Sequence, residues 1–189
     1  MRNSLDDIAD RLGYDVGTSR TTSRQLDIQP AQRHEMVIAA NIIRSSADWY
    51  RPFLDEKDMG QHDVDESWGE TEFRRRQFFI GRDEGIPVGI VSTQLVGDMV
   101  YVGYIYVYDH QTGRGFGPQL LSHARDMAVR EGKRGLVLIA HPKASWATRA
   151  YIRFGFDCIA TTREQVLEWQ SGWLKPYYEE GFELYQYLV

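Results

Sequence analysis

A glycine-rich turn between a predicted strand and a predicted helix is the part of this sequence that most clearly predicts chemistry. Residues 107–121 read Val-Tyr-Asp-His-Gln-Thr-Gly-Arg-Gly-Phe-Gly-Pro-Gln-Leu-Leu, so Gly113, Gly115 and Gly117 alternate with larger residues. Glycine allows a positive φ and lets a ligand approach the main chain closely, and Pro118 suits the first position of a helix. Because the N–H groups at a helix N-terminus are unpaired and attract anions, the turn predicts a site for a phosphate or pyrophosphate.

Two common phosphate-binding patterns do not fit this turn. The Walker pattern requires a lysine directly after its last glycine, whereas Pro118 follows Gly117. The dinucleotide pattern G-x-G-x-x-G requires a third glycine where Leu120 stands. From the residues of the turn alone, a glycine-rich turn that joins a strand to a helix and binds no ligand stays an alternative.

Together with a second segment, the turn resembles the GCN5-related N-acetyltransferase (GNAT) family. The family motif Arg/Gln-x-x-Gly-x-Gly/Ala matches residues 112–117 at both glycines and departs at Thr112, with Gln111 one position early. The family segment Asn-x-x-Ala-x-x-x-Tyr-x-Lys/Arg-x-Gly-Phe matches residues 144–156 except at Ala144, which replaces the asparagine. The resemblance covers about residues 75–160, and the two motifs in this order are specific to the family.

The resemblance implies an α/β (α+β) fold with a mixed, mostly antiparallel sheet flanked by helices. The sheet would splay between a strand ending at Tyr108 and a strand ending at Ala140. The pantetheine arm of acetyl-CoA would lie in this opening, and its pyrophosphate would lie on the glycine turn, with Arg114 or Thr112 replacing the missing Arg or Gln. The implied acetyl-CoA contacts are Tyr106, Val107, Tyr108, Thr112, Gly113, Arg114, Gly115, Phe116, Gly117 and Pro118.

Acetyl transfer to an amine by direct attack in a ternary complex mainly requires positioning and the movement of protons. The amine loses a proton, attacks the thioester carbonyl and expels the CoA thiolate. Tyr151 matches the family tyrosine that can protonate this thiolate, so the resemblance implies a general acid at this position. The alternative is a structural tyrosine on an amphipathic helix.

No general base carries over from the family, so the candidates come from the residues themselves. His141 follows a short apolar run near the expected opening of the sheet, and imidazole titrates near neutral pH. The alternative for His141 is that it is a solvent-facing loop residue, and the same alternative applies to each of the further candidates. The other candidates are His110, Asp109, Glu70 and Glu72.

The composition is typical of a globular enzyme with one domain. The chain has 189 residues, of which 42% are hydrophobic and 26% are charged, enough for a substantial core. We expect a flexible or short helical lead-in over residues 1–24 and one acyl-CoA N-acyltransferase domain over residues 25–189. The net charge of −5 argues against nucleic acid as a partner.

Other classes of protein are disfavoured by simple counts. No apolar run is long enough to span a bilayer, and the polar N-terminus lacks the apolar stretch of a signal peptide. The single cysteine, Cys158, excludes an internal disulfide and is read as a small buried hydrophobe, so we expect a cytoplasmic protein. The five histidines are dispersed and form no Cys/His pattern, and we expect no metal.

Hydrophobic periodicity and turn residues predict alternating helices and strands. Strands are expected at residues 25–29, 77–82, 87–95, 99–108, 135–140, 156–160 and 182–188. Helices are expected at residues 5–12, 30–46, 49–53, 67–75 and 145–154, between Pro118 and a stop at Gly132, and after a capping box formed by Thr162 and Gln165.

Two segments outside the motifs could shape the acceptor side of the site. The acidic run at residues 55–66 could attract a cationic amine, or it could be a solvated loop. Residues 168–182 could form a wall of the acceptor pocket or the interface of a homodimer. The aromatic residues of this second segment are Trp169, Trp173, Tyr177, Tyr178 and Phe182.

The sequence therefore predicts an N-acetyltransferase that uses acetyl-CoA and a small-molecule or peptide amine. One alternative is a CoA-binding sensor or interaction domain without turnover. Another keeps the fold but uses a different acyl-CoA, or an alcohol or thiol acceptor. The retained Tyr151 disfavours the sensor, while Thr112 and Ala144 keep it open.

Overall fold

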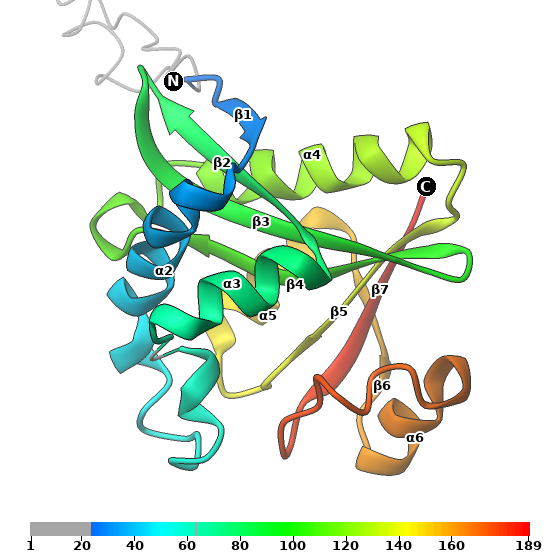
Figure 1. The fold of residues 1–189 in the computed structure, drawn as a ribbon. Coiled ribbons are helices and arrows are strands. Elements are labelled where there is room, and N and C mark those ends of the chain that lie inside the picture. The colour runs from blue at the N-terminus through cyan, green and yellow to red at the C-terminus, as the bar shows by residue number, and fades with distance from the viewer. Residues whose placement is uncertain (1–23, 63) are drawn as a thin grey trace, which may run out of the picture.

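One mixed sheet of seven strands organises the protein (Figure 1). The computed structural model describes residues 24–62 and 64–189; the expected helix at residues 5–12, and all but Arg24 of the predicted lead-in, lie outside them. The strand order is β1-β2-β3-β4-β5-β7-β6, and among these strands only β4 and β5 pair in parallel. The strands are β1 (Asp27–Pro30), β2 (Gln77–Asp83), β3 (Ile86–Val96), β4 (Met99–Val107), β5 (Gly135–Ala140), β6 (Asp157–Ala160) and β7 (Glu183–Leu188). The mostly antiparallel sheet predicted from the sequence is confirmed.

Helices cover both faces of this sheet. Successive strand residues point to opposite faces. Accordingly, Phe78 packs with α2 (Met36–Ser45) and α3 (Glu66–Arg75), whereas Phe79 packs with α4 (Phe116–Arg130) and α5 (Ser145–Phe154). The sixth helix, α6 (Arg163–Glu168), and the aromatic segment after it pack on a third apolar cluster around Val137 and Leu184. None of the described helices combines the length and apolarity that crossing a membrane requires.

Several predicted boundaries are shifted by local chemistry. The expected helix at residues 30–46 begins only at Met36, because Pro30 ends β1 and a short 3-10 helix, η1 (Arg33–Glu35), comes between them. The expected helix at residues 49–53 is instead a 3-10 turn, η2 (Ala47–Trp49), followed by irregular turns. The remaining 3-10 segments are η3 (Met59–Gln61), η4 (Asp109–Gln111) and η5 (Trp169–Gly172).

The helix after the glycine turn begins earlier than the sequence predicts. Gly115 is its N-cap, with φ of 81°, so Pro118 occupies the third helical position rather than the first. Proline is tolerated there because N–H groups of the first turn have no acceptor within the helix. Gly132 follows the helix with φ of 62°, as expected for a C-terminal stop. The capping box of Thr162 and Gln165 is present at α6.

The pairing of β4 with its neighbours opens the sheet in the middle. The register of β3 and β4 shifts between Ser92 and Thr93, which leaves Gly103 as an extra residue in β4. The N–H of Tyr104 donates to the Ser92 hydroxyl at 2.8 Å, so this bulge keeps its hydrogen bond. On its other side, β4 pairs with β5 only from Met99 to Tyr101. Beyond Tyr101 the two parallel strands part.

We expect Gly135→Ala to destabilise the protein, because Gly135 starts the short pairing between β4 and β5. A Cβ atom at this residue would overlap the carbonyl oxygen of Tyr187 on β7. Steric overlap in a packed core costs about 1–3 kcal/mol, which urea denaturation would measure. The control is Gly60→Ala, since an added Cβ at Gly60 meets no described atom within 4 Å. Equal stability of the two variants would contradict this account of the pairing.

Candidate active site

The glycine turn lies at the C-terminal end of β4 and leads directly into α4. Gly113 and Gly115 have φ of 77° and 81°, which strongly favours glycine at both positions. An added Cβ at Gly113 or Gly117 would meet no described atom within 4 Å, so space is open beside the main chain. The first N–H groups of α4 have no acceptor within the helix. This geometry fits a phosphate group bound by main-chain N–H groups.

The side chains of the turn fold back on one another. The Thr112 hydroxyl donates to the carbonyl oxygen of Asp109 at 2.9 Å, which braces the turn. The Arg114 guanidinium donates to the side-chain oxygen of Gln111 and lies over the Phe116 ring, 5.6 Å from its centroid. Gln111 and Arg114, the polar groups adjacent to the motif, are therefore together at the mouth of the turn. Arg114 is exposed and Gln111 is half-buried.

The separation of β4 from β5 leaves one edge of β4 without a neighbouring strand. Tyr106 and Val107 pair with Ile90 and Gly89 on the β3 side. On the other side, the pairing with β5 ends at Tyr101. Main-chain groups on that edge of residues 102–107 can therefore pair with an extended, amide-containing ligand. The opening contains a narrow cavity of about 60 Å³.

Tyr151, the candidate general acid, projects from α5 into this cavity. Burial raises the pKa of its hydroxyl well above the ordinary value, with smaller effects from Tyr50, Tyr185 and Tyr101. The phenol therefore keeps its proton at neutral pH and can donate it. Thiols have a pKa near 8.5, so a phenol with so high a pKa would assist a departing thiolate mainly by a hydrogen bond.

His141, the candidate base, also lines the cavity, directly after β5. The Lys143 N–H donates to its Nδ1 at 3.1 Å, which leaves the ring proton on Nε2. Its ring stacks on Phe53 at 4.8 Å, and burial together with Lys143 lowers its pKa. The imidazole is thus neutral, but in this tautomer Nε2 is a hydrogen-bond donor.

The other predicted candidates for the base lie outside the cavity. His110 and Asp109 contact each other at 3.1 Å on the exposed η4 turn. Glu70 pairs with Arg33 on the surface of α3, and Glu72 forms a buried ion pair with Arg76 at 2.6 Å. In these positions, the four side chains are occupied by other contacts and do not line the opening.

Glu179 is a cavity residue that the sequence analysis did not identify. It lies in the segment between η5 and β7, and only 5% of its surface is exposed. Its side chain lines the same cavity as Tyr151, and its Oε2 accepts no hydrogen bond from any described residue. Desolvation, with a smaller effect of Asp58, raises its pKa to about 8. No sequence motif surrounds Glu179, and the adjacent Glu180 makes the pair look like a solvated turn.

Five further tyrosines line the cavity: Tyr50, Tyr101, Tyr104, Tyr106 and Tyr177. Tyr50 stacks on His62 at 3.9 Å between ring centroids, and the Tyr106 hydroxyl lies 3.0 Å from Nδ1 of the same histidine. Tyr101 stacks on Tyr177 at 5.3 Å. Burial raises the pKa of Tyr50 and Tyr104 to about 12 and that of Tyr101 and Tyr106 further. These hydroxyls therefore stay neutral at physiological pH.

The C-terminal aromatic segment contributes to the cavity only in part. Tyr177 and Phe182 line it, whereas Trp169, Trp173 and Tyr178 do not. Trp173 instead packs on two tyrosines that line the cavity, with its ring centroid 5.2 Å from that of Tyr101 and 5.1 Å from that of Tyr177. Cys158 is exposed on β6, contrary to the buried position expected for it. The reason is that β6 is the edge strand of the sheet, which pairs with β7 on one side and with no described strand on the other.

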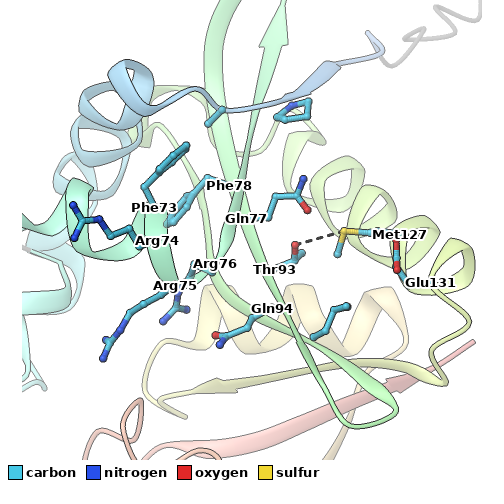
Figure 2. Close-up of a pocket in the computed structure, with 13 residues that line it drawn as sticks. Phe73, Arg74, Arg75, Arg76, Gln77, Phe78, Thr93, Gln94, Met127 and Glu131 are labelled. Carbon is cyan, nitrogen blue, oxygen red and sulfur yellow. Dashed lines mark hydrogen bonds between the residues drawn. The ribbon is translucent and has the colours of Figure 1, made fainter.

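A larger groove of about 560 Å³ lies elsewhere, between the end of α3, strands β2 and β3, and the C-terminal part of α4 (Figure 2). Met127, which lines this groove, lies about 18 Å along the axis of α4 from Gly115, because the helix rises about 1.5 Å per residue. Figure 2 shows the Arg74 and Arg75 side chains pointing away from Thr93 and Met127. Arg74 and Arg75 pair with Glu70 and Glu72, and the groove includes neither the glycine turn nor Tyr151, so we place the active site in the sheet opening.

Solved structures of acetyltransferases share this fold. PaiA N-acetyltransferase from Thermoplasma acidophilum in complex with coenzyme A is 12% identical, with a TM-score of 0.65 over 87% of this chain and 99% of that chain. A GCN5-related N-acetyltransferase from Rhodopseudomonas palustris is 16% identical, with a TM-score of 0.65 over 87% and 96%. A GNAT acetyltransferase from Staphylococcus aureus Mu50 is 17% identical, with a TM-score of 0.65 over 86% and 98%.

The sequence itself identifies the family. Comparison with curated protein sequences gives no match. The family model described as "Acetyltransferase (GNAT) family" matches residues 42–156, which include the glycine turn, the parting strands and Tyr151. The GNAT fold and the enzyme class predicted from the motifs are thus confirmed: the chain belongs to the GNAT family of acetyltransferases.

Proposed function

We propose that this enzyme transfers an acetyl group from acetyl-CoA to an amine by direct attack in a ternary complex. The observation that carries the proposal is the opening between β4 and β5, which joins the glycine turn to a cavity lined by Tyr151. One end of the opening suits a pyrophosphate, and the other end suits a reacting thioester. The coenzyme A in the PaiA complex from Thermoplasma acidophilum belongs to a protein of the same fold and supports this choice of cosubstrate.

The acetyl-CoA contacts follow from the main chain of this region. The N–H groups at the start of α4 would bind the pyrophosphate, and Arg114 or Thr112 would add a polar contact. The open edge of β4 near Tyr106 to Tyr108 would pair with the amides of the pantetheine arm. The proposed contacts are Tyr106, Val107, Tyr108, Thr112, Gly113, Arg114, Gly115, Phe116, Gly117 and Pro118.

The chemistry requires the amine nitrogen to form a bond to the thioester carbon while the carbon–sulfur bond breaks. Tyr151 would donate a hydrogen bond or a proton to the departing sulfur, because its phenol remains protonated in the buried site. His141 would serve as the base only in the tautomer that frees Nε2. The family and the cavity support the transfer reaction, while the identity of the acceptor rests on the chemistry of the cavity walls.

A thiol-release assay tests this function against its alternatives. The purified enzyme is incubated with acetyl-CoA and a panel of primary amines, with matched alcohols and thiols as the other acceptors. We expect amine-dependent release of CoA thiol together with the acetylated amine by mass spectrometry. Binding of acetyl-CoA without turnover on any acceptor would support a CoA sensor, and turnover on alcohols alone would change the acceptor class.

We expect Gly115→Val to weaken acetyl-CoA binding at least tenfold, because the valine side chain would fill the space beside the first N–H groups of α4. Calorimetry with acetyl-CoA would measure the loss. Gly85→Val is the matched control, since Gly85 has φ of 83° close to the 81° of Gly115 but lies in the β2–β3 turn. Both variants carry similar backbone strain, so equal acetyl-CoA affinity in the two would refute the assigned binding site.

We expect Tyr151→Phe to lower kcat by about 10²-fold while acetyl-CoA affinity stays nearly unchanged, because the change removes only the donor to the thiolate. Steady-state kinetics at saturating substrates would measure the effect. Tyr187→Phe is the control, since Tyr187 packs on Phe154 and Phe156 nearby but does not line the cavity. An unchanged kcat, with chemistry shown to limit the rate, would remove Tyr151 from the mechanism.

A further inference from the structure

The carboxylate of Glu179 lacks a partner inside the cavity. Only 5% of the residue is exposed, and Oε2 accepts no hydrogen bond within the described chain. A buried, unpaired carboxylate is costly, so such groups are usually paired or serve a ligand. The backbone around Glu179 is fixed, because the Phe182 N–H donates to the Glu179 carbonyl oxygen at 3.1 Å. The Glu179 carboxyl therefore enters the opening without a counter-charge among the described residues, and its pKa of about 8 keeps it mostly protonated at neutral pH and ionised at higher pH.

The charged neighbours of Glu179 do not neutralise it. Arg76, a buried cation that lies over two of the cavity's tyrosine rings, forms an ion pair with Glu72 and has only 3% of its side chain exposed. Its guanidinium lies over the rings of Tyr104 and Tyr177, at 5.0 and 4.8 Å from their centroids, so those rings and Glu72 hold it. Asp58 adds further negative charge. Once ionised, Glu179 makes the cavity a negative site enclosed by aromatic rings, and a bound cation favours that ionised form.

The rings around this carboxylate are suited to a cation. Tyr50, Tyr101, Tyr104 and Tyr106 line the same cavity as Glu179. Tyrosine faces attract ammonium groups by cation–π interactions, more strongly when water is excluded. The cavity volume of about 60 Å³ admits a slender group but no ring system. A carboxylate among tyrosines in so narrow a space matches the end of an alkylammonium chain.

We propose that Glu179 binds the protonated amine of the acceptor and takes one of its protons, so that the acceptor is a primary ammonium on a slender aliphatic arm. The transfer step rests on the proposed acetyltransferase function, whereas the binding step does not. Glu179 is preferred to His141 because the His141 Nδ1 is occupied by the Lys143 N–H and its Nε2 bears the proton. The carboxylate, in contrast, has a free acceptor atom in the cavity.

The bound ammonium gives one proton to Glu179 and becomes a neutral amine with a free electron pair. Its nitrogen forms a bond to the thioester carbon, the carbon–sulfur bond breaks, and the sulfur leaves with the bonding pair. The nitrogen then loses a second proton as the amide forms, and the sulfur gains one through Tyr151. The products are the N-alkylacetamide, the CoA thiol and a proton held by Glu179.

Binding of a simple cation tests the first half of this proposal without turnover. The probes are n-butylammonium and the neutral n-butanol, titrated into the enzyme at pH 9 and followed by calorimetry and tyrosine fluorescence. We expect wild-type enzyme to prefer the ammonium, and Glu179→Gln to bind it at least tenfold more weakly. The control is Glu180→Gln, since Glu180 is exposed and lies 3.8 Å from Arg163. Equal ammonium affinity in wild type and Glu179→Gln would overturn the proposal.

Turnover tests the second half. With butylamine and acetyl-CoA, we expect Glu179→Gln to lose at least 10²-fold in kcat/KM, while acetyl-CoA affinity is kept. Glu179→Asp, which keeps the charge, should bind butylammonium but turn over more slowly than wild type. If wild type binds the cation and acetyl-CoA but acetylates no amine, the proposed function fails and the ammonium site stands. If amines are acetylated equally well without the Glu179 carboxylate, the reverse holds.

The pH dependence of stability tests the premise that Glu179 is buried without a partner. Its folded-state pKa of about 8 exceeds the ordinary 4.5, so the folded protein binds the proton more tightly than the unfolded chain. Stability due to this group is present below pH 4.5 and is lost as pH rises through 8. Wild type should therefore lose thermal stability between pH 5 and 9 relative to Glu179→Gln. Parallel curves for the two proteins would contradict the premise.

Other titratable and charged groups near Glu179 also contribute to the pH dependence of stability. These groups are present in both proteins, so their own titration cancels in the comparison. A loss of thermal stability near pH 8 that wild type shows and Glu179→Gln does not is therefore due to Glu179. The facing and neighbouring groups are Tyr50, Tyr101, Tyr104, Tyr106, Asp58, His62, His141 and Arg76.

Discussion

The short pairing between β4 and β5 is the constraint on which the site depends. Only Met99 to Tyr101 pair with Gly135 to Val137, and the two strands then part. Because the strands are parallel, their C-terminal ends lie at the same edge of the sheet, and the turn into α4 lies there as well. The first N–H groups of α4, the free edge of β4 and the cavity are consequences of this one separation. A longer pairing would close the opening and remove the place for a thioester.

The bulge at Gly103 links this opening to the buried charges. Glycine is required there because the Arg76 guanidinium lies against the main chain where a Cβ would be. Arg76 could not otherwise reach Glu72 and the tyrosine rings at the same time. The Ser92 hydroxyl accepts the Tyr104 N–H, so the bulge leaves no broken hydrogen bond on that residue. The distortion of β4 is therefore fully compensated inside the protein.

Local signals in the sequence were sufficient for most of the fold and for placing the glycine turn between β4 and α4. Alternating apolar residues and glycine turns predict strands and helices because these depend on neighbours in the chain. The same signals misplaced Pro118, since the positive φ of Gly115 lets α4 begin before the proline. The acidic run at residues 55–66 was read by composition, yet Met59, His62 and Val64 within it are buried. Burial there depends on packing that composition does not contain.

Glu179 shows why the acceptor side could not be predicted in the same way. Glu179 and Glu180 are identical side chains in sequence, but Glu180 is exposed beside Arg163 while Glu179 enters the cavity. The difference arises because β7 inserts between β5 and β6 and carries the preceding segment over the opening. Arg76 lies over two of the tyrosine rings that line the cavity of Glu179, and of these two groups only Arg76 pairs with an opposite charge among the described residues, that of Glu72. In the ammonium site proposed above, this unpaired carboxylate would favour a cationic acceptor over an anionic one.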